Sequence, residues 1–238
     1  MKKTIVLSIV LCAITTIGFT QNHALTRQLT SDLYLVDEYI QRGDKGMSYM
    51  DSKDYIGTPY NNESYLPGKV YGDDVVLMSD IAIRYNVIED EMEIKESLST
   101  PDNEAKALVK SADIFVKIVN DIFVFVPFEG DDENGGYFQV IEEGGQASLF
   151  KKLKKKFTKA QIATSSITRD VPAKFKDDNE YFVVNSLGKF TELPSSKKKA
   201  LLLFGDKKDQ IKEFMKKSNL QFDEEADLIR IFKYYNSI

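Results

Sequence analysis

The apolar residues up to about residue 193 fall into short runs separated by turn residues. The runs are rich in aromatic and β-branched side chains, which is typical of strands. They are VVLMSDIAIRYNV (75–87), DIFVFVPF (121–128), GYFQVI (136–141), ASLFKKL (147–153) and EYFVVN (180–185). Most gaps between them are too short for the dozen or more residues of a parallel crossover. The pattern therefore predicts an antiparallel meander sheet or a half-open barrel.

Two of the gaps have the composition of hairpin turns. EGDDENGG (129–136) ends in Asn134-Gly135, a pair that accepts positive φ, and EEGGQ (142–146) contains two adjacent glycines. We predict a hairpin turn at each of these positions.

The apolar spacing becomes helical near the end of the chain. Two sets of residues recur at intervals of three and four: Ile211, Phe214 and Met215, then Leu228, Ile231 and Phe232. This rhythm predicts two or three short helices. The predicted fold class is mainly β, of the α+β type. It has an antiparallel β-rich domain at 22–193 and a C-terminal helical segment at 194–238 packed on it.

The segment IAIRYNVIEDEMEIKE (81–96) predicts two strands joined by a turn. Its apolar residues occupy odd positions up to Val87 and even positions from Met92 onwards. A turn or bulge between Asn86 and Asp90 explains this slip of one residue. The polar face of the second strand then holds Glu89, Glu91, Glu93 and Lys95. We expect these acids to face water, as in a half-exposed antiparallel strand, although their spacing of roughly 6.6 Å would also suit two-carboxylate catalysis.

The first residues, MKKTIVLSIVLCAITTIGFTQN, are typical of a secretory signal peptide, with two lysines before an apolar run. The run is shorter than the roughly 20 residues of a membrane-spanning helix, and no second run of that length follows. We predict a signal peptide at 1–21 and a mature chain without a transmembrane helix, exported to the periplasm or the extracellular space. Cys12 is then lost with the signal, because Leu11 before it is too large for lipoprotein cleavage.

Charge is distributed unevenly along the chain. Residues 22–148 carry 25 acidic and 10 basic side chains, whereas 149–238 carry 12 and 20, a net charge of −7 for the mature chain. Attraction between the two halves within one folded body is one interpretation. The basic residues concentrate in KKLKKKFTK (151–159), which could bind an anionic surface such as lipid head groups or acidic polysaccharide, or protect a sheet edge. We expect no nucleic-acid partner at this net charge and without a binding motif.

Residue types for nucleophilic or metal chemistry are scarce. His23 is the one histidine and follows the predicted signal peptide, and the mature chain keeps no cysteine. This excludes a Cys/His pair and zinc or iron bound by His and Cys, and it leaves a Ser-His-Asp triad dependent on the N-terminal tail. Two acids converging in a cleft remain a route to hydrolysis of envelope polysaccharide. We assign no catalytic, metal or cofactor residue.

Two other groups of side chains could bind ligands. One group, in the loop 129–136, offers oxygen ligands to calcium without the glycine of an EF-hand: Glu129, Asp131, Asp132, Glu133 and Asn134. The other could line a groove for sugar or peptide: Tyr49, Tyr55, Tyr60, Tyr65 and Tyr71. The alternatives, which we favour, are a solvated hairpin loop and tyrosines that cover the sheet.

Three segments carry a resemblance to known sequences: GTPYNNESYLPGKVY (57–71), IRYNVIEDEMEIK (83–95) and KKDQIKEFMKKSNLQFDEEADLIRIFKYYN (207–236). The chain resembles an uncharacterised family of exported, β-rich envelope proteins of Gram-negative bacteria. The resemblance implies localisation and architecture, but no activity, cofactor or site residue. Our leading hypothesis is a non-enzymatic envelope protein that binds a protein, an envelope component or an apolar ligand through its sheet. The competing hypothesis is a carboxylate-dependent hydrolase.

Overall fold

The computed structural model describes residues 40–41, 55–73, 75–128, 131–163 and 169–238. The predicted signal peptide, His23 and Tyr49 lie outside these residues, so the predictions that concern them stay predictions. The described residues belong to the unit that runs from Ile40 to Ile238.

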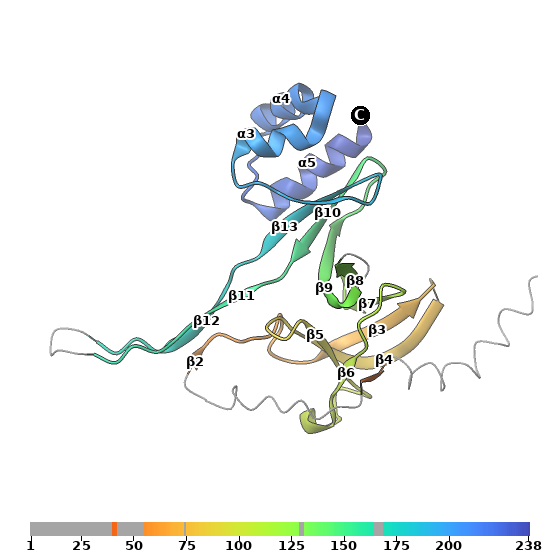
Figure 1. Cartoon of the computed structure of the whole chain (residues 1–238), viewed down its shortest axis with the longest axis vertical. Coiled ribbons are helices and arrows are strands. Elements are labelled where there is room, and N and C mark those ends of the chain that lie inside the picture. The colour runs from red at the N-terminus through yellow and green to blue at the C-terminus, as the bar shows by residue number, and fades with distance from the viewer. Residues whose placement is uncertain (1–39, 42–54, 74, 129–130, 164–168) are drawn as a thin grey trace, which may run out of the picture. The chain divides into compact units, whose positions relative to one another are not determined.

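A large antiparallel sheet forms most of this unit, as Figure 1 shows, and confirms the predicted mainly β fold. The strands follow the order β1-β6-β5-β4-β3-β7-β8-β9-β10-β13-β14. Their bounds are β1 (Ile40–Gln41), β3 (Leu66–Gly72), β4 (Val75–Asn86), β5 (Glu91–Lys95), β6 (Lys106–Leu108), β7 (Ile114–Ile118), β8 (Asp121–Phe128), β9 (Asp131–Glu142), β10 (Ala147–Lys152), β13 (Glu180–Asn185) and β14 (Phe190–Glu192). In the described residues β1 and β14 do not pair with each other, so the sheet is open.

The sheet curls around an aromatic core. Strands β4 and β8 are separated by β3 and β7 in the strand order, yet the ring of Tyr85 in β4 lies 5.5 Å from that of Phe123 in β8 and 6.0 Å from that of Tyr137 in β9. All three side chains are buried. The curl therefore brings β4 close to β8 and β9, and large side chains fill the space between them.

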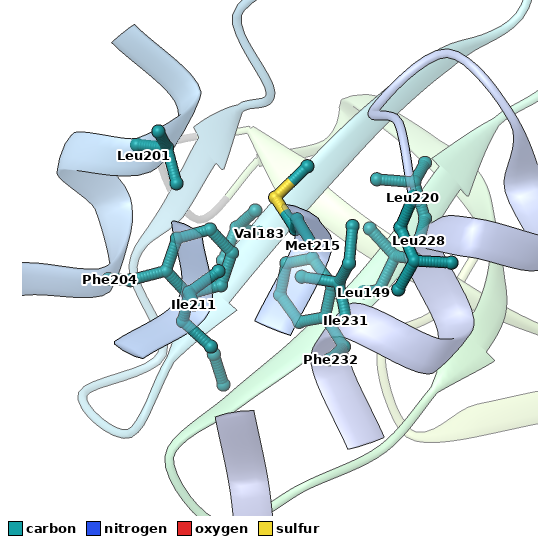
Figure 2. Close-up of a cluster of buried hydrophobic side chains, with 11 residues drawn as sticks. Leu149, Val183, Leu201, Phe204, Ile211, Met215, Leu220, Leu228, Ile231 and Phe232 are labelled. Atoms are coloured by element: carbon teal, nitrogen blue, oxygen red, sulfur yellow. The ribbon is translucent and has the colours of Figure 1, made fainter. Parts of the chain in front are cut away.

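The helices at the end of the chain cover β10 and β13. They are α3 (Lys197–Ala200), the 3-10 helix η2 (Leu201–Lys207), α4 (Lys208–Ser218) and α5 (Glu225–Ser237). Figure 2 shows their buried side chains meeting Leu149 of β10 and Val183 of β13. The helical residues in this cluster are Leu201, Phe204, Ile211, Met215, Leu228, Ile231 and Phe232, with Leu220 from the connection before α5. The predicted helical spacing is confirmed, while the boundary at residue 194 stays a prediction.

The hairpin predicted at 129–136 is confirmed, because β8 and β9 pair as consecutive antiparallel strands, but its turn residues were predicted wrongly. Asn134 and Gly135 lie inside β9, and β8 pairs with β9 as far as Phe128 opposite Asp131. Gly135 serves close packing instead, because a Cβ there would lie 2.5 Å from the carbonyl oxygen of Val126. The other turn is confirmed, since β9 and β10 form a hairpin across 143–146.

A second, small sheet was not predicted. It consists of β2 (Tyr55–Ile56), β11 (Lys155–Thr158) and β12 (Ala173–Asp177). β11 and β12 are antiparallel, and β2 runs parallel to β12 (Figure 1). β11 follows β10 after a break of only two residues, so the lysine-rich stretch 151–159 is shared between the two sheets.

Candidate functional site

The acidic block 81–96 folds into the predicted pair of strands, but part of its exposure was predicted wrongly. β4 ends at Asn86, β5 begins at Glu91, and the turn lies between them. Glu89 is exposed, whereas Glu93 and Lys95 are only 7% and 6% exposed. Their face of the sheet is covered by the segment before β3, whose Pro59 carbonyl accepts a hydrogen bond from Val87.

Glu93 is the centre of a buried polar network. Its Oε2 accepts hydrogen bonds from Arg84 Nη2 at 2.7 Å, Arg84 Nε at 3.0 Å and the Tyr65 hydroxyl at 2.8 Å. The Arg84 guanidinium carbon lies 3.7 Å from the ring centroid of Tyr60 and 4.2 Å from that of Tyr65, a cation–π arrangement. The positive charge is thus paired with a carboxylate and further stabilised by two aromatic rings.

This network has fixed protonation states. Burial and the neighbouring Glu93 charge raise the pKa of Tyr65, so its hydroxyl stays protonated and donates. Burial alone would lower the pKa of Arg84, but the hydrogen bond and charge of Glu93 outweigh it and raise that pKa. Neither group is poised to exchange a proton near neutral pH, so the network is suited to stability rather than to acid–base catalysis.

A second charged pair, Asp90 with Lys152, forms hydrogen bonds to the backbone of β9. Lys152 Nζ donates to Asp90 Oδ1 at 2.8 Å and to the Tyr137 carbonyl at 3.0 Å, while the Tyr137 N–H donates to Asp90 Oδ1 at 3.2 Å. The β10 pairing with β9 reaches only Gln139, so these two side chains replace the missing strand partner at Tyr137. Burial lowers the pKa of Lys152 although Asp90 opposes the change.

Most of the lysine-rich stretch 151–159 is paired with carboxylates. Besides Lys152 with Asp90, the ion pairs are Lys151 with Glu225 at 2.8 Å, Lys154 with Glu180 at 2.7 Å and Lys155 with Asp177 at 2.5 Å. Burial opposes ionisation of Glu225, but its bonds from Lys151 and Tyr181 prevail and lower its pKa. Within the described residues, Lys156 and Lys159 are the exposed members of the stretch that have no ion pair.

Lys156 belongs to the ribbon formed by β2, β11 and β12, whose two faces differ. The register of β11 and β12 continues beyond the strands to the bridge between Gln161 and Val171. One face, here called the lysine face, holds Lys156, Lys174 and Lys176 together with Ile56 and Ile162. The other, the aromatic face, holds Tyr55, Phe157 and Phe175, whose rings contact one another at 4.8 Å for Phe157 and Phe175 and at 5.2 Å for Tyr55 and Phe175.

The sequence prediction included only part of this ribbon. Ile56, Lys174, Lys176 and Ile162 were not singled out, although AKFKD (173–177) alternates with the period of a strand. The two-residue strand β2 carries no comparable signal, because its pairing depends on residues that lie far apart in the sequence.

The tyrosines proposed for a groove are dispersed. Tyr60 and Tyr65 pack against Arg84, Tyr55 contacts Phe175, and Tyr71 stacks on Phe115 with centroids 4.6 Å apart. A pocket of about 270 Å³ lies beside Tyr71. It is lined by Pro67, Gly68, Lys69, Tyr71, Asp80, Lys117 and Val119. Asp80 is the one carboxylate in that lining, so the pocket does not offer the two converging acids that a glycosidase needs.

Two further predictions concern metal binding and membrane spans. The side chains proposed for calcium, from Glu129 to Asn134, lie outside those the structure describes, so that prediction stays untested. In the part that it does describe, no group of three or more His, Cys, Asp or Glu side chains is arranged to hold a metal ion. No helix among those residues has both the length and the apolar composition needed to cross a membrane.

Comparison with family models, with curated proteins and with solved structures finds no match to this chain. The resemblance to exported envelope proteins therefore stays a prediction from the three quoted segments. The ribbon formed by β2, β11 and β12 is the candidate functional site, because the three lysines and two isoleucines of its lysine face are exposed, and none of those lysines has an ion pair within the described residues.

Proposed function

We propose that the chain is a non-enzymatic exported protein of the bacterial envelope that binds an envelope component through the ribbon. The observation that carries the proposal is the concentration of exposed apolar side chains there. Ile162 is 83% exposed, Ile56 61% and Phe157 47%. With Val171 they make four of the nine large exposed apolar side chains among the described residues, with Ile56 and Ile162 on the lysine face and the other two on the aromatic face. Single exposed apolar residues are ordinary, whereas a group of them marks an interaction surface.

The interior of the curled sheet is filled by side chains, which favours binding at the surface of the protein over binding inside it. Tyr85, Phe123 and Tyr137 occupy that interior and are fully buried against one another. A lipid carrier would instead need an unfilled apolar groove. We therefore assign binding to the ribbon and not to the core.

The burial of the acids also favours binding over catalysis. Glu93 is held by Arg84 and Tyr65, and Asp90 by Lys152 and Tyr85. A hydrolase needs one carboxylate that stays protonated and a second that is free to act. These two acids of the block are engaged in contacts within the fold, so the hydrolase is the weaker of the two hypotheses.

The test is export and fractionation of the untagged chain in a Gram-negative host. We expect the chain to be cleaved near residue 21 and to sediment with the envelope fraction. Ile56→Ser/Ile162→Ser should move it to the soluble fraction, whereas the control Leu187→Ser/Leu202→Ser, which changes two equally exposed residues outside the ribbon, should not. Mass spectrometry of each fraction measures both outcomes. An unprocessed or wholly soluble wild-type chain, or equal behaviour of the two variants, would contradict the proposal.

A further inference from the structure

We infer that the lysine face of the ribbon docks on the surface of an anionic phospholipid bilayer. The inference rests on the proposed function and names the envelope component. Three lysines of β11 and β12 lie on this face. Lys156 and Lys176 are directly opposite each other in the antiparallel pair, and Lys174 lies two residues from Lys176 on the same face.

This arrangement is unfavourable for the isolated ribbon. Like charges directly opposite each other in an antiparallel pair repel and destabilise the pairing. The neighbouring pair shows the favourable alternative, since Lys155 lies opposite Asp177 and forms an ion pair with it. Lys156, Lys174 and Lys176 are exposed and have no ion pair within the described residues. An anionic surface would relieve the repulsion that the fold leaves in place.

The apolar residues on the same face distinguish a bilayer from an acidic polysaccharide. Ile56 lies beside Lys174 in the register of β2 with β12, and Ile162 continues the face beyond the strand. A surface with lysines flanking apolar side chains can place its charges among lipid head groups and its apolar groups at the acyl boundary. A polysaccharide would use the lysines but give the isoleucines no apolar medium.

Ring contacts on the aromatic face stabilise the pairing of the strands in the ribbon. Phe157 and Phe175 pack across the two strands, and Tyr55 from β2 contacts Phe175 edge to face. A hairpin without such packing is only marginally stable in water. The aromatic contacts therefore stabilise the ribbon from one side, while the three lysines on its other side have no ion pair within the described part of the chain.

The experiment is vesicle co-sedimentation of the exported, processed chain. One set of vesicles is phosphatidylcholine alone, and the other contains about one third phosphatidylglycerol. We expect binding to the anionic set only, weakened by salt. Each lysine near such a surface strengthens binding about fivefold, so Lys156→Gln/Lys176→Gln should weaken it about 25-fold. The control Lys212→Gln/Lys216→Gln removes the same charge from exposed positions of α4 and should change it less than about twofold.

The isoleucines decide between the two surfaces. Ile56→Ser/Ile162→Ser should weaken binding to anionic vesicles about tenfold, because apolar burial at the acyl boundary is lost. Circular dichroism of each variant checks that the fold is intact. If the isoleucine variant binds anionic vesicles as tightly as the wild type, apolar contact at the acyl boundary is absent and the inference is overturned. If alginate is bound in preference to vesicles, the partner is an acidic polysaccharide and the inference is likewise overturned. Absence of vesicle binding overturns it too, while ribbon-dependent envelope fractionation would leave the proposed function standing.

Discussion

Replacing Glu93 with glutamine tests whether the acidic block is part of the fold or a binding site. Glutamine keeps the size of the side chain and one hydrogen-bond acceptor, so the change removes the charge and little else. Arg84, which makes two hydrogen bonds to Glu93 Oε2, is then left buried without its carboxylate. We predict that Glu93→Gln destabilises the fold.

The magnitude follows from the burial of the pair. Removing one partner of a buried ion pair costs about 3–5 kcal/mol. Among the described residues Arg84 has one other ion-pair partner, Asp102 at 3.8 Å, and that side chain is 64% exposed, so it compensates little. Because glutamine still accepts a hydrogen bond, we expect the lower value, about 3 kcal/mol. For a domain of this size the melting temperature should fall by roughly 6–12 °C.

Urea unfolding followed by far-ultraviolet circular dichroism is the assay, since the chain contains no tryptophan. Glu91→Gln is the matched control, because Glu91 lies on the same strand and the same face but is half-buried, and it should change the free energy of unfolding by less than about 0.5 kcal/mol. The double variant Arg84→Met/Glu93→Met should lose less than the sum of its single changes by at least about 1.5 kcal/mol. Equal unfolding midpoints for Glu93→Gln and Glu91→Gln would refute the reasoning.

Two further predictions compare matched substitutions in the core and in the sheet. The Tyr85 hydroxyl donates to Asp90, whereas the buried Tyr137 hydroxyl has no hydrogen-bond partner among the described residues. Tyr85→Phe should therefore lose about 1 kcal/mol in urea unfolding and Tyr137→Phe nothing, and equal losses would contradict this. A Cβ at Gly68 would lie 2.9 Å from the Lys117 carbonyl oxygen, while one at Gly145 meets nothing within 4 Å. Thermal unfolding should show a loss of about 1–3 kcal/mol for Gly68→Ala and almost none for Gly145→Ala, and similar melting temperatures would count against the close packing of β3 on β7.

The elements that the sequence predicted well are those whose signal is local. The change of register in 81–96 located the turn between β4 and β5, and the three–four spacing near Phe232 located the buried side of α5. Both depend only on neighbouring residues and on the period of a strand or a helix. The glycine pair at 144–145 marked a hairpin for the same reason.

The burial of Glu93 could not be predicted from its own segment. Alternation shows which side chains share a face of a strand, but not whether another segment covers that face. The cover comes from Tyr60 and Tyr65, which lie about thirty residues earlier and bring a ring and a hydroxyl to the Arg84–Glu93 pair. The wrong placement of the turn at Asn134-Gly135 has a similar origin. Gly135 has no Cβ that would clash with β8, and this contact between two strands cannot be seen in the sequence around Gly135.

The uneven charge of the chain supports the assignment of the ribbon. If attraction between the acidic half (22–148) and the basic half (149–238) explained the uneven charge, most ion pairs would join the two halves. Among the described residues only two do, Lys152 with Asp90 and Lys233 with Glu142, whereas the other paired lysines of 151–155 find their carboxylates within the basic half itself. Folding therefore leaves most of the positive surplus unneutralised. The ribbon holds part of that surplus on one exposed face, opposite its own aromatic packing, which is where an anionic partner would be needed.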